Sequence, residues 1–66
     1  MLGLKLKELR KEKGLTQKQV AEILKVDSST VRKWELSLRE PNLSSLIKLA
    51  DFFEVSTDYL LGRKDY

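Results

Sequence analysis

One segment near the middle of the chain combines residue types that can contact nucleic acid bases. At about 100° per residue, a helix in this segment would place five side chains within roughly 140° of arc: Ser28, Ser29, Arg32, Lys33 and Leu36. Arginine and lysine donate hydrogen bonds to O6 and N7 of guanine in the major groove, and serine can bond to any base. The spacing therefore predicts a short basic face that contacts DNA bases, with a solvated helix surface as the alternative.

The residue types needed for metal binding and for much of catalysis are missing from the sequence. The 66 residues include no cysteine and no histidine, which excludes zinc fingers, disulfide staples, thiol nucleophiles and a histidine general base. A domain of this size buries only about 60% of its unfolded surface, so it has no room for a deep substrate cavity. We expect a protein that is not an enzyme and that has no cofactor and no metal ion.

The net charge of +3 is distributed unevenly along the chain. Residues 1–33 contain nine basic and four acidic residues, whereas residues 34–66 contain four basic and six acidic ones. A basic half is typical of a domain that meets nucleic acid or an acidic partner, although charge alone equally suits a solvated surface. The longest stretch without charge, residues 41–47, is far shorter than the roughly 20 residues of a membrane span. The sequence therefore predicts a soluble, intracellular protein.

The sequence predicts an all-α fold class with five short helices and no strand. Apolar residues on one face and a stop at Gly14 predict a first helix over about residues 3–13. Thr16 and Gln19 have the form of a capping box, which would start a second helix of about eight residues. Asp27 is a good N-cap for a third helix that runs to about Leu36.

The two predicted helices toward the C-terminus continue this pattern. Asn42 can cap a fourth helix, and a short fifth helix is expected to start at Ser56 and to stop at Gly62. The apolar stripe of the fourth helix, which we expect in the core, consists of Leu43, Leu46, Ile47, Ala50 and Phe53.

The tight connection between the second and third helices predicts a helix-turn-helix. Only Lys25 and Val26 lie between them. Trp34 falls on the inner side of the third helix, where it would pack in the core. Free backbone amides at the start of the second helix, together with Gln17, would suit a phosphate group.

The chain resembles the Cro/repressor helix-turn-helix family, also called Xre-type or lambda-repressor-like domains, from about Leu4 to Gly62. The resemblance rests on segments that occur in order: LKELRKEKGLTQKQVAEIL, STVRKWE, REPNLSSLIKLADFF and STDYLLG. It implies a compact five-helix domain that occupies residues 1–66, with a core at about residues 4–62. It also implies binding to operator DNA as a two-fold dimer, with the third helix in the major groove.

The resemblance assigns roles to individual residues. Base contacts are implied for Ser28, Ser29, Arg32 and Lys33, and phosphate contacts for Thr16, Gln17, Lys18, Ser37, Leu38 and Arg39. It implies that Arg10 and Glu35 form a structural pair, tying the first helix to the third. Dimer contacts are implied for Thr57, Tyr59 and Leu60.

Three residues depart from the pattern of this family. Lys25 stands in the turn where glycine is common, and a left-handed conformation there would cost about 1 to 2 kcal/mol. Ser37 also replaces a frequent glycine. Leu36 stands where a polar or basic residue is usual, and it could meet a thymine methyl group, pack under the following loop, or join a protein interface.

Two functional hypotheses follow from the sequence. The first is a cytoplasmic, nucleoid-associated transcriptional regulator of bacterial or phage type, most simply a repressor that binds a palindromic double-stranded operator as a homodimer. The alternative is a protein-interaction module, for example one like an antitoxin, that uses Leu36, Leu38 and Phe52 as an apolar surface. Because the motif ends just before Tyr66, we expect either a minimal regulator or the N-terminal part of a longer one.

Overall fold

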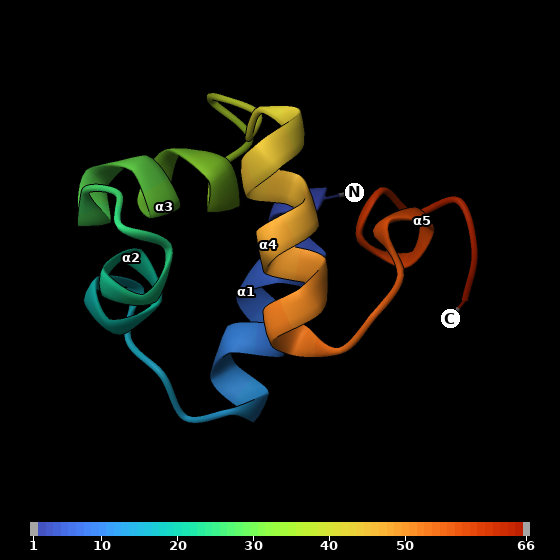
Figure 1. Cartoon of the computed structure of the whole chain (residues 1–66), viewed down its shortest axis with the longest axis horizontal. Helices are drawn as coiled ribbons and strands as arrows, with labels where there is room; N and C mark the ends of the chain where they lie inside the picture. The colour runs from blue at the N-terminus through green and yellow to red at the C-terminus, as the bar shows by residue number, and fades with distance from the viewer. Residues whose placement is uncertain (1, 66) are drawn as a thin grey trace.

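Five α-helices form the part of the chain that the structure, a computed structural model, describes, which is residues 2–65. They are α1 (Leu2–Glu12), α2 (Gln17–Leu24), α3 (Ser28–Glu35), α4 (Leu43–Phe53) and α5 (Thr57–Leu60). In Figure 1, α1 and α4 lie in the middle, α2 and α3 lie together on one side, and α5 lies on the other. Residues 2–65 contain no strand. The predicted all-α class is confirmed.

The starts of α2 and α3 differ in how their first amides are satisfied. The predicted capping box is present, because Thr16 Oγ1 accepts from the Gln19 amide at 3.0 Å and Gln19 Oε1 accepts from the Thr16 amide at 2.8 Å. Asp27 occupies the N-cap of α3, as predicted, but its side chain makes no cap hydrogen bond. Its backbone carbonyl accepts from the Thr30 amide at 2.9 Å instead, and its carboxylate stays exposed.

All five helices of residues 2–65 end in the same way. The chain turns into the left-handed conformation, and two successive amides donate to carbonyls of the last helical turn. The left-handed residues are Gly14, Lys25, Ser37, Glu54 and Gly62. At Lys25 the angles are φ 59° and ψ 45°. The expected left-handed turn between α2 and α3 is therefore present.

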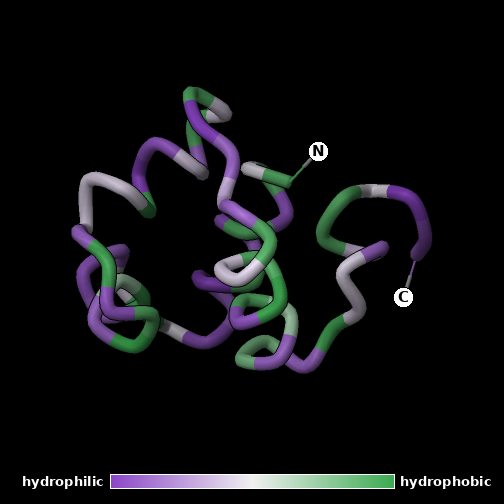
Figure 2. Tube along the Cα trace, turned by 45° about the horizontal axis from the view of Figure 1, so that its top comes forward, coloured by the Kyte–Doolittle hydropathy of each residue, from purple (hydrophilic) through white to green (hydrophobic). Residues whose placement is uncertain are grey.

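Each helix contributes one apolar face to a single core. Figure 2 shows hydrophobic and hydrophilic residues alternating along the helices. Trp34 of α3 is buried, as predicted. The predicted stripe of α4 is wrong in part: Leu43 and Ile47 are exposed, whereas Leu49, absent from that stripe, is fully buried beside Ala50. Because α4 carries apolar residues on more than one face, periodicity alone allowed two inner faces, and packing selects the one through Leu49.

Gly3 allows the start of α1 to lie directly against the end of α3. A Cβ atom at this position would lie 2.6 Å from the Glu35 carbonyl oxygen and 2.8 Å from that of Trp34. Both atoms belong to the backbone, so they cannot rotate away. The close approach fixes where the exposed face of α3 points relative to α1.

We expect Gly3→Ala to lower the free energy of unfolding by about 1 to 3 kcal/mol, because the added methyl group overpacks this contact. Helix propensity alone would give the opposite sign, since alanine is favoured over glycine by about 1 kcal/mol inside a helix. Urea denaturation followed by circular dichroism measures the difference. Leu4→Ala, at an exposed neighbouring position, is the control and should change stability by less than about 0.5 kcal/mol. An unchanged or more stable Gly3→Ala variant would contradict the close approach.

Within residues 2–65, the helices are too short and too polar for any of them to cross a bilayer.

Candidate nucleic-acid interface

The outer face of α3 presents the side chains that the sequence proposed as base contacts. Ser28, Ser29, Arg32 and Lys33 are all exposed, whereas Val31 and Trp34 on the opposite side of the helix are buried. The structure therefore brings the four polar candidates together on one surface. Leu36, the C-cap residue of α3, is 53% exposed next to them.

A partly buried network of polar side chains ties α3 to α1 and α2. Arg10 Nε donates to Glu35 Oε2 at 2.6 Å, and Arg10 Nη2 donates to Glu35 Oε1 at 3.1 Å. The side chains are only 11% and 3% exposed, respectively. Arg10 Nη1 also donates to the Leu15 carbonyl at 2.8 Å. The predicted pairing of Arg10 with Glu35 is thus present. It is bidentate, which is the strongest geometry for a hydrogen-bonded guanidinium and carboxylate.

Gln17, a candidate phosphate contact, belongs to the same network. Its Nε2 donates to Glu35 Oε1 at 3.0 Å, and the residue is partly buried. An amide nitrogen carries two N–H bonds, so one donor remains for a phosphate oxygen. No local residue pattern predicts this hydrogen bond, because it joins residues 18 positions apart on different helices.

The other candidates at the start of α2 differ in what they can offer. Lys18 is exposed, so its ammonium group is free to approach an anion. Thr16 uses its amide and one lone pair of its hydroxyl in the capping box, which leaves the hydroxyl proton as its donor. The backbone amides of Gln17 and Lys18 have no acceptor within the helix by its geometry.

The loop after α3 holds three of the predicted phosphate contacts, and two of their backbone amides are already bonded. The Ser37 amide donates to the Trp34 carbonyl at 3.1 Å, and the Leu38 amide donates to the Lys33 carbonyl at 2.9 Å. Leu38 has no other donor, because its amide closes the helix and its side chain is apolar, so it offers no free hydrogen bond to a phosphate. The hydroxyl of Ser37 is the donor that remains for a phosphate oxygen.

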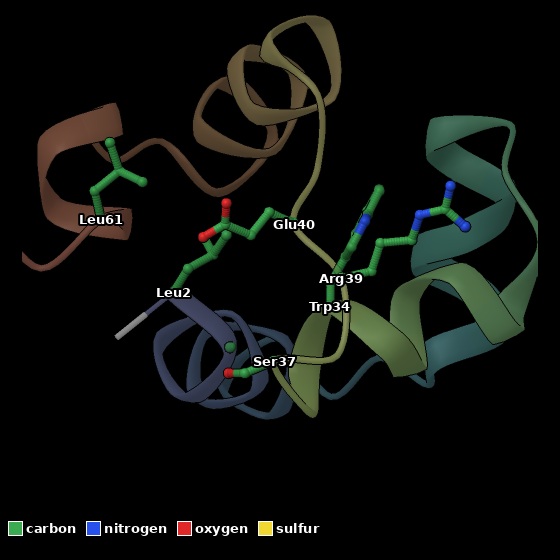
Figure 3. A pocket seen from close by; sticks show the side chains of 7 residues that line it. Leu2, Trp34, Ser37, Arg39, Glu40 and Leu61 are labelled. Atoms are coloured by element: carbon green, nitrogen blue, oxygen red, sulfur yellow. The ribbon is translucent and has the colours of Figure 1, made fainter.

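A shallow cavity of about 320 Å³ lies where the start of α1, the loop after α3 and the end of α5 meet. Figure 3 shows the Glu40 side chain extending toward Leu2, whereas the Arg39 side chain extends in the opposite direction, away from Leu61. Arg39 also lines a hollow with Thr30 of α3. Of the three loop candidates, Arg39 is the exposed cation.

The predicted dimer residues of α5 are less exposed than expected. Leu60 is fully buried in the core of its own chain, so its predicted place in a dimer interface is wrong. Thr57 and Tyr59 are partly buried, and Lys5 Nζ covers the Tyr59 ring at 4.4 Å from its centroid. The exposed apolar residue at this end is Leu61. Because α5 is a single turn, its sequence alone does not define which side faces the core.

No group of metal-ligating side chains assembles anywhere in residues 2–65.

Comparisons with known proteins agree with the geometry of α2 and α3. A family model described as helix-turn-helix matches residues 6–60. The HTH-type transcriptional regulator ImmR of Bacillus subtilis (strain 168) is 42% identical over 64 residues, covering 97% of this chain and 50% of ImmR. The HTH-type transcriptional activator BcrR of Enterococcus faecalis is 43% identical over 61 residues, covering 92% of this chain and 30% of BcrR.

A solved structure extends the likeness to three dimensions. The P22 c2 repressor, crystallised in complex with a synthetic operator, matches with a TM-score of 0.91 at 28% identity, and the match covers 97% of both chains. The chain spans half or less of the length of ImmR and BcrR. These relatives are transcriptional regulators rather than enzymes, as the residue types predicted.

Proposed function

The chain belongs to the helix-turn-helix family of Cro/repressor type, and on that premise we propose that it regulates transcription by binding a specific double-stranded DNA sequence. The exposed face of α3 carries this proposal. An α-helix with its side chains is about 10 to 12 Å across, which matches the width of the major groove. In that groove, Arg32 and Lys33 would donate to guanine, while Ser28 and Ser29 would bond to neighbouring bases.

Contacts to the DNA backbone would come from residues on both sides of this face. Gln17 is held by Glu35 at the start of α2, and Lys18 and Arg39 are exposed cations. Phosphate contacts fix the register of a protein on the duplex but do not read sequence. These three residues would therefore set the position of α3 in the groove.

We propose that two copies bind together. The longest dimension of the Cα trace is 28 Å, whereas successive major grooves on one side of DNA lie about 34 Å apart. One chain can thus read only one groove, and a pair related by two-fold symmetry would read a palindromic operator. The surface beside α5 suits this pairing, because the exposed side chains of Leu43 and Leu61 line one hollow.

The simplest outcome of such binding is repression, because a bound dimer would deny the polymerase access to a promoter. One relative is named an activator, so the sign of regulation needs its own measurement. A reporter gene behind the selected operator should lose expression when the protein is present; increased expression would establish activation.

Selection from a random pool of double-stranded DNA tests the proposed function. We expect a two-fold symmetric consensus whose half-sites lie about one helical turn apart. Affinity for that operator should fall by about 0.9 log unit per log unit of salt for each phosphate neutralised. The proposal would be contradicted if no sequence were enriched, or if the affinity for DNA did not change with salt concentration.

Exposed leucines favour a second candidate, a protein-interaction module. Leu36 and Leu38, two positions apart, are 53% and 71% exposed. Phe52, the third residue of that hypothetical surface, instead packs partly against the core, with its ring 4.9 Å from that of Phe53. Protein capture that is insensitive to salt, together with no DNA selection, would support this candidate.

A further inference from the structure

Leu36 is the one large apolar side chain on the DNA-facing surface of α3. By helix geometry it lies near the middle of the arc that Ser28, Ser29, Arg32 and Lys33 occupy. Its backbone angles, φ −85° and ψ 0°, keep it close to the helical path, so the side chain continues the surface of α3. With 53% of its surface exposed, it is not part of the core.

The direction of helical side chains places Leu36 over the two cations. A Cα–Cβ bond on a helix tilts toward the N-terminus, so each residue covers the surface over the preceding turn. For Leu36 that turn contains Arg32 and Lys33, four and three positions earlier. The isobutyl group therefore lies beside whichever base pair these cations read.

We propose that Leu36 is a specificity-determining residue that contacts the 5-methyl group of a thymine adjacent to the base pair read by Arg32 and Lys33. This inference rests on the proposed function. The thymine methyl group is the apolar feature of the major-groove edge, and it sits beside hydrogen-bond acceptors of the neighbouring bases. Contact between the two apolar groups removes both from water.

The surroundings of Leu36 favour DNA over an apolar protein surface as its partner. An apolar partner that covered Leu36 would also take Arg32 and Lys33 out of water without offering them acceptors, which is costly. The major groove satisfies the two cations and the leucine together. Leu38 differs, because it lies beyond the left-handed Ser37 and off the surface of α3.

Replacement of single thymines by deoxyuridine in the selected operator tests the inference. Deoxyuridine removes only the methyl group. For the unaltered protein we expect one position in each half-site at which the replacement weakens binding about fourfold, the effect of one buried methyl group. For Leu36→Ala, affinity for the thymine operator should be lower, and replacement at that position should have no further effect.

Leu38→Ala is the matched control, because it removes an exposed leucine two positions away and should keep the thymine sensitivity. Circular dichroism checks that each variant is folded. The inference would be overturned if deoxyuridine at that position weakened binding equally for Leu36→Ala and for the unaltered protein. It would also be overturned if no thymine of an otherwise specific operator were sensitive to the replacement. Either result would leave the proposed function intact. A random pool that yields no operator at all would overturn the proposed function and this inference with it.

Discussion

Replacing Glu35 with alanine should lower the free energy of unfolding by about 3 to 5 kcal/mol, the cost of leaving one partner of a buried ion pair alone. Arg10, whose side chain is 11% exposed, would keep its charge without the carboxylate that accepts from two of its nitrogens. Gln17 would lose the same acceptor. A chain of 66 residues is expected to have only roughly 3 to 10 kcal/mol of total stability. The variant should therefore lose roughly a third or more of the stability of the domain.

Urea denaturation followed by the fluorescence of Trp34, which is buried in α3, measures this loss. The double variant Arg10→Met with Glu35→Leu removes both charges and should recover much of the stability. Arg63→Ala is the control, because Arg63 forms a longer, exposed pair with Asp58 at 3.9 Å and should matter by less than about 1 kcal/mol. If Glu35→Ala cost no more than Arg63→Ala, the Arg10 network would not be what holds α3 in place.

Replacing Arg32 or Lys33 with alanine should weaken binding to the selected operator by about 1 to 3 kcal/mol each, and replacing both by up to about 6 kcal/mol. Each removes donors from the exposed face of α3 that would bond to guanine. Binding to random DNA should weaken less, because only the general attraction to phosphate is lost there. The ratio of the two affinities, from fluorescence anisotropy at fixed salt, is the informative quantity.

Lys48→Ala, on the exposed side of α4, removes the same charge away from α3 and should leave that ratio unchanged. Equal losses on operator and random DNA for the Arg32 and Lys33 variants would show that these residues attract the backbone instead of reading bases. The same assay applied to Gln17→Ala distinguishes a phosphate contact from a base contact. Without a phosphate contact, affinity should fall by the same factor for the operator and for random DNA.

The sequence predicted those features that depend on neighbouring residues. The capping box of Thr16 and Gln19 satisfies its amides within four positions, so the start of α2 could be identified. The order and approximate ends of the helices could also be predicted, because caps and stops depend on residues close together in the sequence. The pairing of Arg10 with Glu35 came from the resemblance to the family, because no local signal joins residues 25 positions apart.

Features that depend on tertiary packing were missed or misread. The backbone approach at Gly3 is set by how α1 crosses the end of α3, which no residue pattern encodes. Leu43 and Leu49 are both plausible core residues by period, and only the arrangement of the other helices decides between them. In α5, one turn of helix gives too few positions to define an inner face, so Leu60 was assigned to a dimer surface although it lies in the core.

The shared way in which the helices end also bears on how this domain can evolve. At Lys25, Ser37 and Glu54, the left-handed conformation is held by residues other than glycine. Glycine at any of these positions would relieve a steric cost, offset in part by the extra freedom of glycine in the unfolded chain. A lineage that changes its DNA target by altering Ser28 or Lys33 therefore has three sites, all outside α3, at which lost stability can be regained.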